Sequence, residues 1–100
     1  MAGLDCAEIS ETAWPTLRDG MHGTITVDDD EVHDAMRDLA TVGLPIGDCG
    51  AAPVAALRAL ATEQACAELR ADVGLDDSTR ALLIATEGPT DPESYRAIIG

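Results

Sequence analysis

The sequence predicts an α/β fold that is rich in helix and contributes about two strands to a mostly parallel sheet. Apolar residues recur at helical spacing in several segments, and residues 24–27 and 81–86 have the composition of strands. Because the strand-like runs alternate with helical segments, the order is that of an α/β architecture. A two-stranded sheet is marginal alone, so residues 1–100 are predicted to form one partial domain.

The first half contains two predicted helices around a predicted strand. Ala13, Trp14 and Leu17 indicate a short helix that is interrupted near Pro15. Residues 24–27 are β-branched and predict a strand that leads directly into a helix. That helix is predicted over residues 29–40, because Asp28 and Glu31 have capping-box spacing and one apolar stripe follows, formed by Val32, Ala35, Met36 and Leu39.

The second half begins with a glycine-rich loop over residues 41–50. A helix is predicted from residue 51, with Pro53 in its first turn, and residues 63–71 continue or restart it before Gly74. Three further elements are predicted: a turn at 76–79, a strand at 81–86 that is buried on both faces, and a final helix capped by Asp91, started by Pro92 and ended at Ile99.

Charge and composition exclude several classes of partner. Nineteen acidic residues face six arginines and no lysine, giving a net charge of −13, so nucleic acid and membrane surfaces are not expected as partners. No apolar stretch is long enough to cross a bilayer, and the N-terminus has no signal-peptide pattern. Cys6, Cys49 and Cys66 lack paired spacing, which suits reduced thiols. A cytoplasmic location is therefore expected.

Two loops have the pattern of ligand-binding segments. Residues 47–52, Gly-Asp-Cys-Gly-Ala-Ala, precede a predicted helix and could present backbone N–H groups to an anion or cofactor, although Asp48 would oppose an anion. The alternative is a helix entry that needs glycine only for packing. Residues 86–91, Thr-Glu-Gly-Pro-Thr-Asp, follow the second predicted strand, at the edge where α/β sheets bind ligands. The alternative is an ordinary turn capped by Asp91.

These blocks carry a family resemblance. The segment "AGLDC" at the start, Trp14, "GDCGAA" and "TEGPTDPESYR" together resemble the C-terminal region of the diaminopropionate ammonia-lyases. These are pyridoxal 5'-phosphate enzymes of the tryptophan synthase β-type fold, also called fold type II. The resemblance implies the C-terminal part of the large domain of such an enzyme, which converts 2,3-diaminopropionate, a small amino-acid substrate, to pyruvate and ammonia.

The resemblance also implies cofactor-binding residues. Thr86 takes the position of the residue that faces the pyridine nitrogen, and Gly47, Asp48, Cys49 and Gly50 take the positions of the loop on the cofactor side. The family loop reads Gly-Glu-Ser-Gly-Ala-Ala, so Asp48 replaces a glutamate and Cys49 a serine. These replacements put the polar contacts of the loop in question.

A pyridoxal enzyme holds its cofactor as a Schiff base on a lysine, and this chain has none. No catalytic residue is therefore assigned, and the chain alone is expected to be inactive. The expected partner is a missing N-terminal cofactor-binding part or a homodimer partner. The resemblance places Met1 at an internal position of the longer family members, so we expect a truncated gene, a displaced start codon or one piece of a split protein.

Two other classes remain as alternatives. One is a non-enzymatic module, partner-dependent or vestigial, because an apolar strand with open edges must be covered. The other is an acyl-carrier-like protein modified at Ser78, although a carrier serine opens a helix near the middle of its chain. Metal binding has little support: residues 28–31 lack the pattern of a calcium loop, and His22 and His33 share no helical face.

Overall fold

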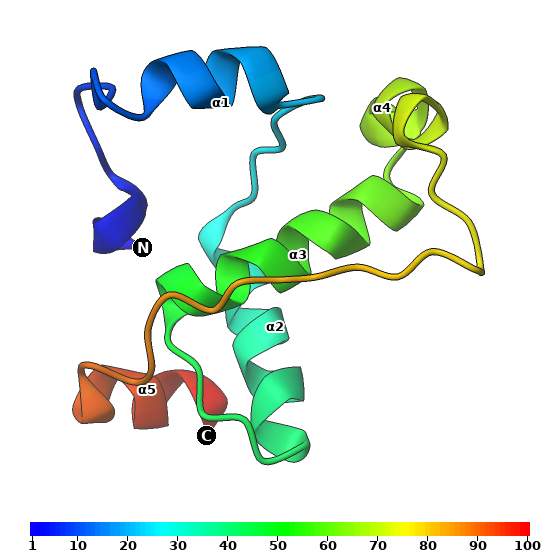
Figure 1. Cartoon of the computed structure of the whole chain (residues 1–100). Coiled ribbons are helices and arrows are strands. Elements are labelled where there is room, and N and C mark those ends of the chain that lie inside the picture. The colour runs from blue at the N-terminus through cyan, green and yellow to red at the C-terminus, as the bar shows by residue number, and fades with distance from the viewer.

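The computed structural model describes residues 1–100 as five α-helices and two short 3-10 helices (Figure 1). In chain order they are η1 Ala2–Leu4, α1 Trp14–Gly20, α2 Asp29–Thr41, α3 Asp48–Thr62, η2 Gln64–Cys66, α4 Ala67–Val73 and α5 Pro92–Ile99.

The predicted α/β class is wrong for this chain, because it contains no strand. Residues 24–27 and 81–86 are irregular, and neither segment takes part in a backbone hydrogen bond. β-Branched and apolar composition favours a strand only when another segment pairs with it, and none does so here. The second segment, predicted to be buried on both faces, is instead exposed, with Leu82 at 88% and Ile84 at 69%. The mostly parallel sheet is thus absent.

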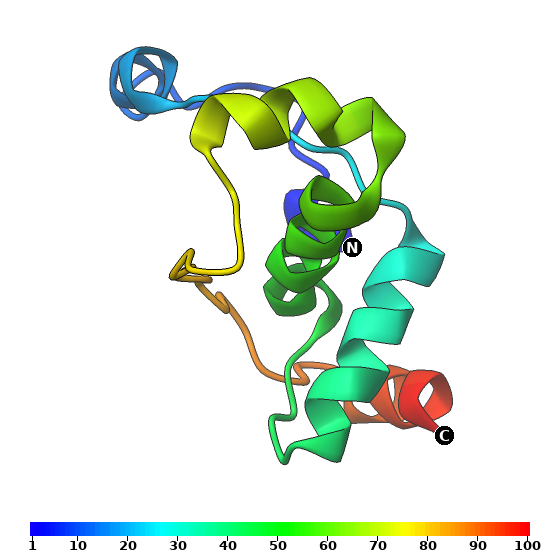
Figure 2. The ribbon, with the colours of Figure 1, turned by 90° about the vertical axis from the view of Figure 1, so that its right-hand side faces the viewer.

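The core lies where α2 crosses α3, with α5 packed on the other end of α2 (Figures 1 and 2). Small side chains on α3 allow the two helices to approach closely, and only Met36 and Val32 are large among the fully buried residues. The packed set is Val32, Ala35 and Met36 of α2 with Ala51, Ala52 and Ala55 of α3. Arg37 of α2 links to α5, because its Nε donates to the carbonyl oxygen of Ile98 at 3.0 Å.

Local capping signals explain where these helices begin. The backbone N–H of Glu31 donates to Asp28 at 2.9 Å and the backbone N–H of Asp28 donates to Glu31 at 2.8 Å, which confirms the capping box of α2. Asp91 accepts from the N–H groups of the second and third residues of α5, at 3.1 Å each, which confirms the cap predicted there. Gly74 ends α4 with φ of 68°, as predicted for a terminating glycine.

The start of α3 differs from the prediction. The helix begins at Asp48 and includes the last three residues of the predicted loop, so Pro53 lies in its interior instead of its first turn. Proline there removes only the hydrogen bond to the carbonyl of Cys49, and the alanine-rich sequence that follows maintains the helix. In α1, Pro15 is tolerated in the first turn and does not interrupt the helix.

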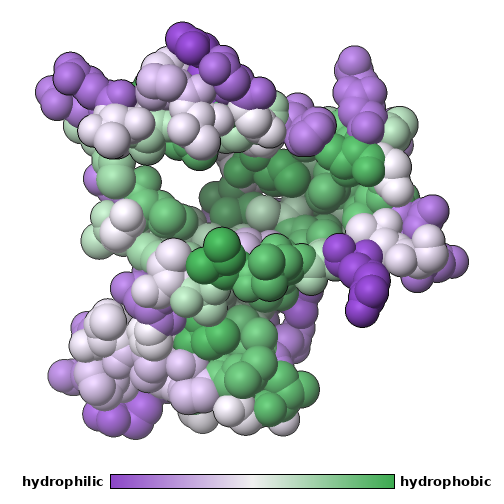
Figure 3. Space-filling model, viewed as in Figure 1, coloured by the Kyte–Doolittle hydropathy of each residue, from purple (hydrophilic) through white to green (hydrophobic).

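The molecule is open around this core. Helix α1 contacts no other helix, and only ten of the hundred residues are buried (Figure 2). The space-filling view has apolar side chains on its surface and a hollow beside α1 (Figure 3). None of the helices combines the length and apolar composition that crossing a bilayer would require.

Candidate functional site

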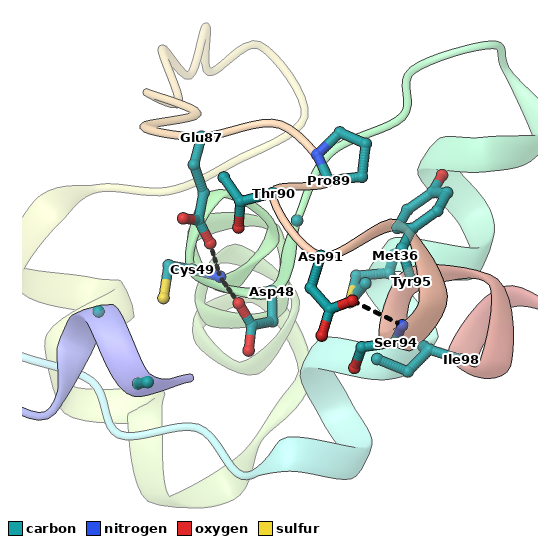
Figure 4. Close-up of a pocket in the computed structure, with 13 residues that line it drawn as sticks. Met36, Asp48, Cys49, Glu87, Pro89, Thr90, Asp91, Ser94, Tyr95 and Ile98 are labelled. Carbon is teal, nitrogen blue, oxygen red and sulfur yellow. Dashed lines mark hydrogen bonds between the residues drawn. The ribbon is translucent and has the colours of Figure 1, made fainter.

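The two ligand-binding loops predicted from sequence lie against each other at the N-terminus of α3 (Figure 4). The backbone N–H of Cys49 donates to Oδ1 of Asp48 at 2.8 Å and to Oε1 of Glu87 at 3.3 Å. Residues 86–91 therefore cross the start of α3, and Glu87 has a hydrogen-bond partner there.

Glycine makes this approach possible. A Cβ atom at Gly47 would lie 2.5 Å from the carbonyl oxygen of Gly88, and one at Gly50 would lie 2.7 Å from the carbonyl oxygen of Glu87. Both distances are far below van der Waals contact. The glycines of the "GDCGAA" loop are therefore required for packing, as one of the two interpretations of the sequence expected. This packing does not test whether the loop also binds a ligand.

A cavity of about 270 Å³ lies between the start of α3, helix α5 and η1. Three carboxylates line it, those of Asp48, Glu87 and Asp91, and no lysine, arginine or histidine does so. Because like charges gather there, the cavity favours cationic groups and repels anions. Its other lining residues are Ala2, Gly3, Met36, Gly47, Cys49, Pro89, Thr90, Ser94, Tyr95 and Ile98.

Charge and burial set the protonation of two side chains in the cavity. The N-terminal amine of Met1 lies 2.8 Å from Oδ2 of Asp48. Its hydrogen bond to Asp48 lowers the pKa of that carboxyl to about 2, and the same bond raises the pKa of the amine. Burial raises the pKa of the Cys49 thiol, so this sulfur is neutral at pH 7 and is poorly suited to nucleophilic attack.

Only some of the five predicted cofactor-binding residues line the cavity. Gly47, Asp48 and Cys49 line the cavity, and Gly50 is buried beneath the main chain of Glu87. Thr86 is exposed and does not line the cavity. The role carried to Thr86 by the resemblance stays a prediction, as do the roles of the loop residues.

Sequence reasoning gave no role to Ser94 and Tyr95, although both line the cavity. They belong to the "TEGPTDPESYR" block, so the family resemblance was the signal that pointed to them. Met36 was predicted only as a core residue, and it lines the cavity because α2 passes beside α5.

Two other candidates can be compared with this geometry. Ligand atoms of Asp48, Cys49 and Glu87 lie within 4.8 Å of one another, but both carboxylates already accept from the N–H of Cys49 and the buried thiol is protonated, so the group is not arranged as a metal site. Ser78 lies in a turn, where its hydroxyl and its N–H both donate to Asp76, at 2.7 and 2.9 Å. The next helix begins only at Pro92, so Ser78 does not open a helix as a carrier serine does.

Comparison with known proteins supplies the decisive observation. The chain aligns over 105 positions, 99% of its length, with diaminopropionate ammonia-lyase of Salmonella typhimurium at 35% identity. Over almost its whole length, this chain is similar to part of diaminopropionate ammonia-lyase. The resemblance expected from the sequence blocks is thereby confirmed. The chain spans 26% of the length of that ammonia-lyase. No family model matches the chain, and no solved structure does so.

The ammonia-lyase resemblance implies pyridoxal 5'-phosphate, and the cavity of this chain does not fit that group. The phosphate of the cofactor is an anion, whereas Asp48, Glu87 and Asp91 supply only negative charge. The N–H of Cys49, at the start of α3, already donates to two carboxylates and is not free to bind a phosphate. With no lysine in the chain, the aldehyde of the cofactor has no amine with which to form a Schiff base.

Proposed function

We propose that this chain forms a non-catalytic part of a pyridoxal-phosphate-dependent ammonia-lyase that acts on 2,3-diaminopropionate in the cytoplasm. The observation that carries the proposal is the 35% identity over 99% of the chain. The three unpaired cysteines are compatible with a reducing compartment.

The geometry supports a role on the substrate side of such a site. 2,3-Diaminopropionate carries two amino groups, and protonated amines suit a cavity lined by the carboxylates of Glu87 and Asp91, beside Asp48, which already pairs with the N-terminal amine. The close contact between the "GDCGAA" loop and residues 86–91 holds these carboxylates on a fixed frame. In this proposal the chain contributes charge and shape, whereas the Schiff-base lysine and the phosphate site come from outside residues 1–100.

The test is to replace the aligned quarter of the Salmonella enzyme with this chain and to measure ammonia and pyruvate release. We expect activity from the chimera and none from the same enzyme with the quarter deleted. A matched control carries Asp91→Asn, which weakens the cavity charge while an amide oxygen can still cap α5. A chimera that is soluble and loaded with cofactor but releases no ammonia would refute the proposal.

A non-enzymatic interaction module is the second candidate. The observation that favours it is the open structure, in which α1 contacts no other helix. A chimera that assembles normally but releases no ammonia would favour the interaction module over the ammonia-lyase. The acyl-carrier alternative has no such support, because Ser78 lies in a turn held by Asp76.

A further inference from the structure

The three carboxylates that line the cavity differ in how far their charges are already compensated. Oδ2 of Asp48 lies 2.8 Å from the N-terminal amine of Met1, so a cation already neutralises that side chain. Oδ1 of Asp91 accepts from two N–H groups of α5, at 3.1 Å each, and so interacts with the positive end of that helix. Glu87 forms no ion pair, and only its Oε1 accepts a hydrogen bond. Its charge is therefore the least compensated of the three.

The side chain of Glu87 is nevertheless held in a fixed position. Its Oε1 accepts from the N–H of Cys49 at 3.3 Å, and a Cβ at Gly47 would lie 3.2 Å from that oxygen, so glycine leaves room for the carboxylate. Its main chain packs against Gly50, as the 2.7 Å approach to its carbonyl oxygen shows. Glu87 is half-buried, so solvent screens its charge less than that of an exposed carboxylate. The second oxygen, Oε2, is thus already positioned for a cationic ligand.

A primary ammonium group is the cation that this end of the cavity accommodates. The N-terminal amine is such a group, and it already lies against Asp48. In Figure 4 the carboxylates of Glu87 and Asp48 both approach the backbone nitrogen of Cys49, whereas Asp91 lies apart at the start of α5. Ligand atoms of Asp48 and Glu87 lie within 4.8 Å of each other, so a second ammonium at Glu87 would relieve the repulsion between like charges. The volume of about 270 Å³ suits a ligand the size of an amino acid.

We propose that Glu87 is a specificity-determining residue of the cavity, and that its Oε2 binds the 3-ammonium group of 2,3-diaminopropionate. The inference rests on the proposed function for the identity of the ligand. An ammonium donates a charge-assisted hydrogen bond to a carboxylate, whereas the hydroxyl that serine carries at the same position has no charge. Glu87 therefore distinguishes the diamino acid from serine, which differs from it only in that group.

The experiment titrates the isotopically labelled full chain with 2,3-diaminopropionate and, separately, with serine, at neutral pH. The amide resonance of Cys49 reports on the site, because its N–H donates to Glu87. We expect saturable shifts with diaminopropionate and an affinity for serine at least about 10-fold lower. Glu87→Gln should lower the affinity for diaminopropionate about 10-fold and leave that for serine unchanged. The glutamine oxygen can still accept from the N–H of Cys49, so the loop keeps its position.

Glu93→Gln is the matched control. Glu93 is an exposed acidic residue in the first turn of α5 and does not line the cavity. The substitution makes the same change in net charge, so it should leave both affinities unchanged. Its comparison with Glu87→Gln separates a contact at Glu87 from a general effect of the negative charge of the chain.

Several results would overturn the proposal. They are an amide of Cys49 that does not shift with diaminopropionate, equal affinities for diaminopropionate and serine, and equal losses with Glu87→Gln and Glu93→Gln. The chimera separates the role of Glu87 from the proposed function. An active chimera whose ratio of kcat/KM for diaminopropionate to kcat/KM for serine is unchanged by Glu87→Gln contradicts only the role of Glu87. A chain that binds diaminopropionate through Glu87 but gives an inactive chimera contradicts only the proposed function.

Discussion

Replacing Gly47 with alanine tests whether residues 86–91 rest on the start of α3. The backbone of Gly47 has φ of −71° and ψ of 175°, which alanine adopts without strain. The effect of the change is therefore steric. The new Cβ would lie 2.5 Å from the carbonyl oxygen of Gly88, and ordinary contact begins at 3.4 Å, so the loop must move by about 0.9 Å.

Overpacking of this kind costs about 1–3 kcal/mol of unfolding free energy. The displacement also strains the hydrogen bond from Cys49 N–H to Glu87, which already spans 3.3 Å. Gly50→Ala forces a smaller shift, from 2.7 Å, and gains roughly 1 kcal/mol of helix propensity inside α3, so its net cost is lower. Once Gly47→Ala has moved the loop, adding Gly50→Ala should cost little more, and the two effects should not add.

The assay is urea unfolding followed by far-UV circular dichroism, with Gly20→Ala as the control. Gly20 is the last residue of α1, and a Cβ there meets nothing within 4 Å. We expect Gly20→Ala to be neutral or slightly stabilising. Equal stability of Gly47→Ala and Gly20→Ala would refute the contact between the loop and α3, and full additivity with Gly50→Ala would refute its rigidity.

Three further changes test the caps and charges of the structure. Asp28→Ala removes the capping box of α2 and should lower stability by about 1 kcal/mol in the same urea assay, with a loss of helical signal. Arg70→Gln removes two hydrogen bonds of 2.6 Å to carbonyls at the C-terminal end of α3, and should cost about 1–3 kcal/mol and speed amide exchange in the last turn of that helix. The pKa of Asp48 is lowered from 3.8 to about 2, so the stabilisation that this carboxylate gives the folded state is present above pH 4 and is lost as pH falls through 2. Solvent screening limits this stabilisation to about 1 kcal/mol. Asp48→Asn should therefore reduce the loss of stability at acidic pH when unfolding free energy is measured against pH.

Helices could be predicted from the sequence because their signals are local. Capping at Asp28 and Asp91, the stop at Gly74 and the apolar stripe of α2 each act within a few residues, and the structure has the corresponding elements. The start of α3 was predicted too late because Pro53 was taken as a first-turn residue, although a proline further along costs one hydrogen bond that a long alanine-rich helix can lose.

The absence of strands could not be predicted in this way, because strand pairing is not local. Residues 81–86 have the composition of a buried strand, but composition cannot supply the neighbour that a strand needs. The cavity illustrates the same limit. Both of its loops were recognisable as motifs, yet their contact depends on a chain path that brings Gly88 against Gly47, 41 residues away. The exposed position of Thr86 likewise follows from that path and not from the motif.

The alanine-rich core of α2 and α3 has a calorimetric consequence. Heat capacity rises on unfolding in proportion to newly hydrated apolar area, by about 12–15 cal/mol/K per residue in ordinary domains. Only ten residues of this chain are buried, and all but Met36 are smaller than leucine, with alanine the most frequent. The heat-capacity increment should therefore fall below that range, which gives a shallow stability curve and a broad melting transition that sharpens only when more apolar surface is covered.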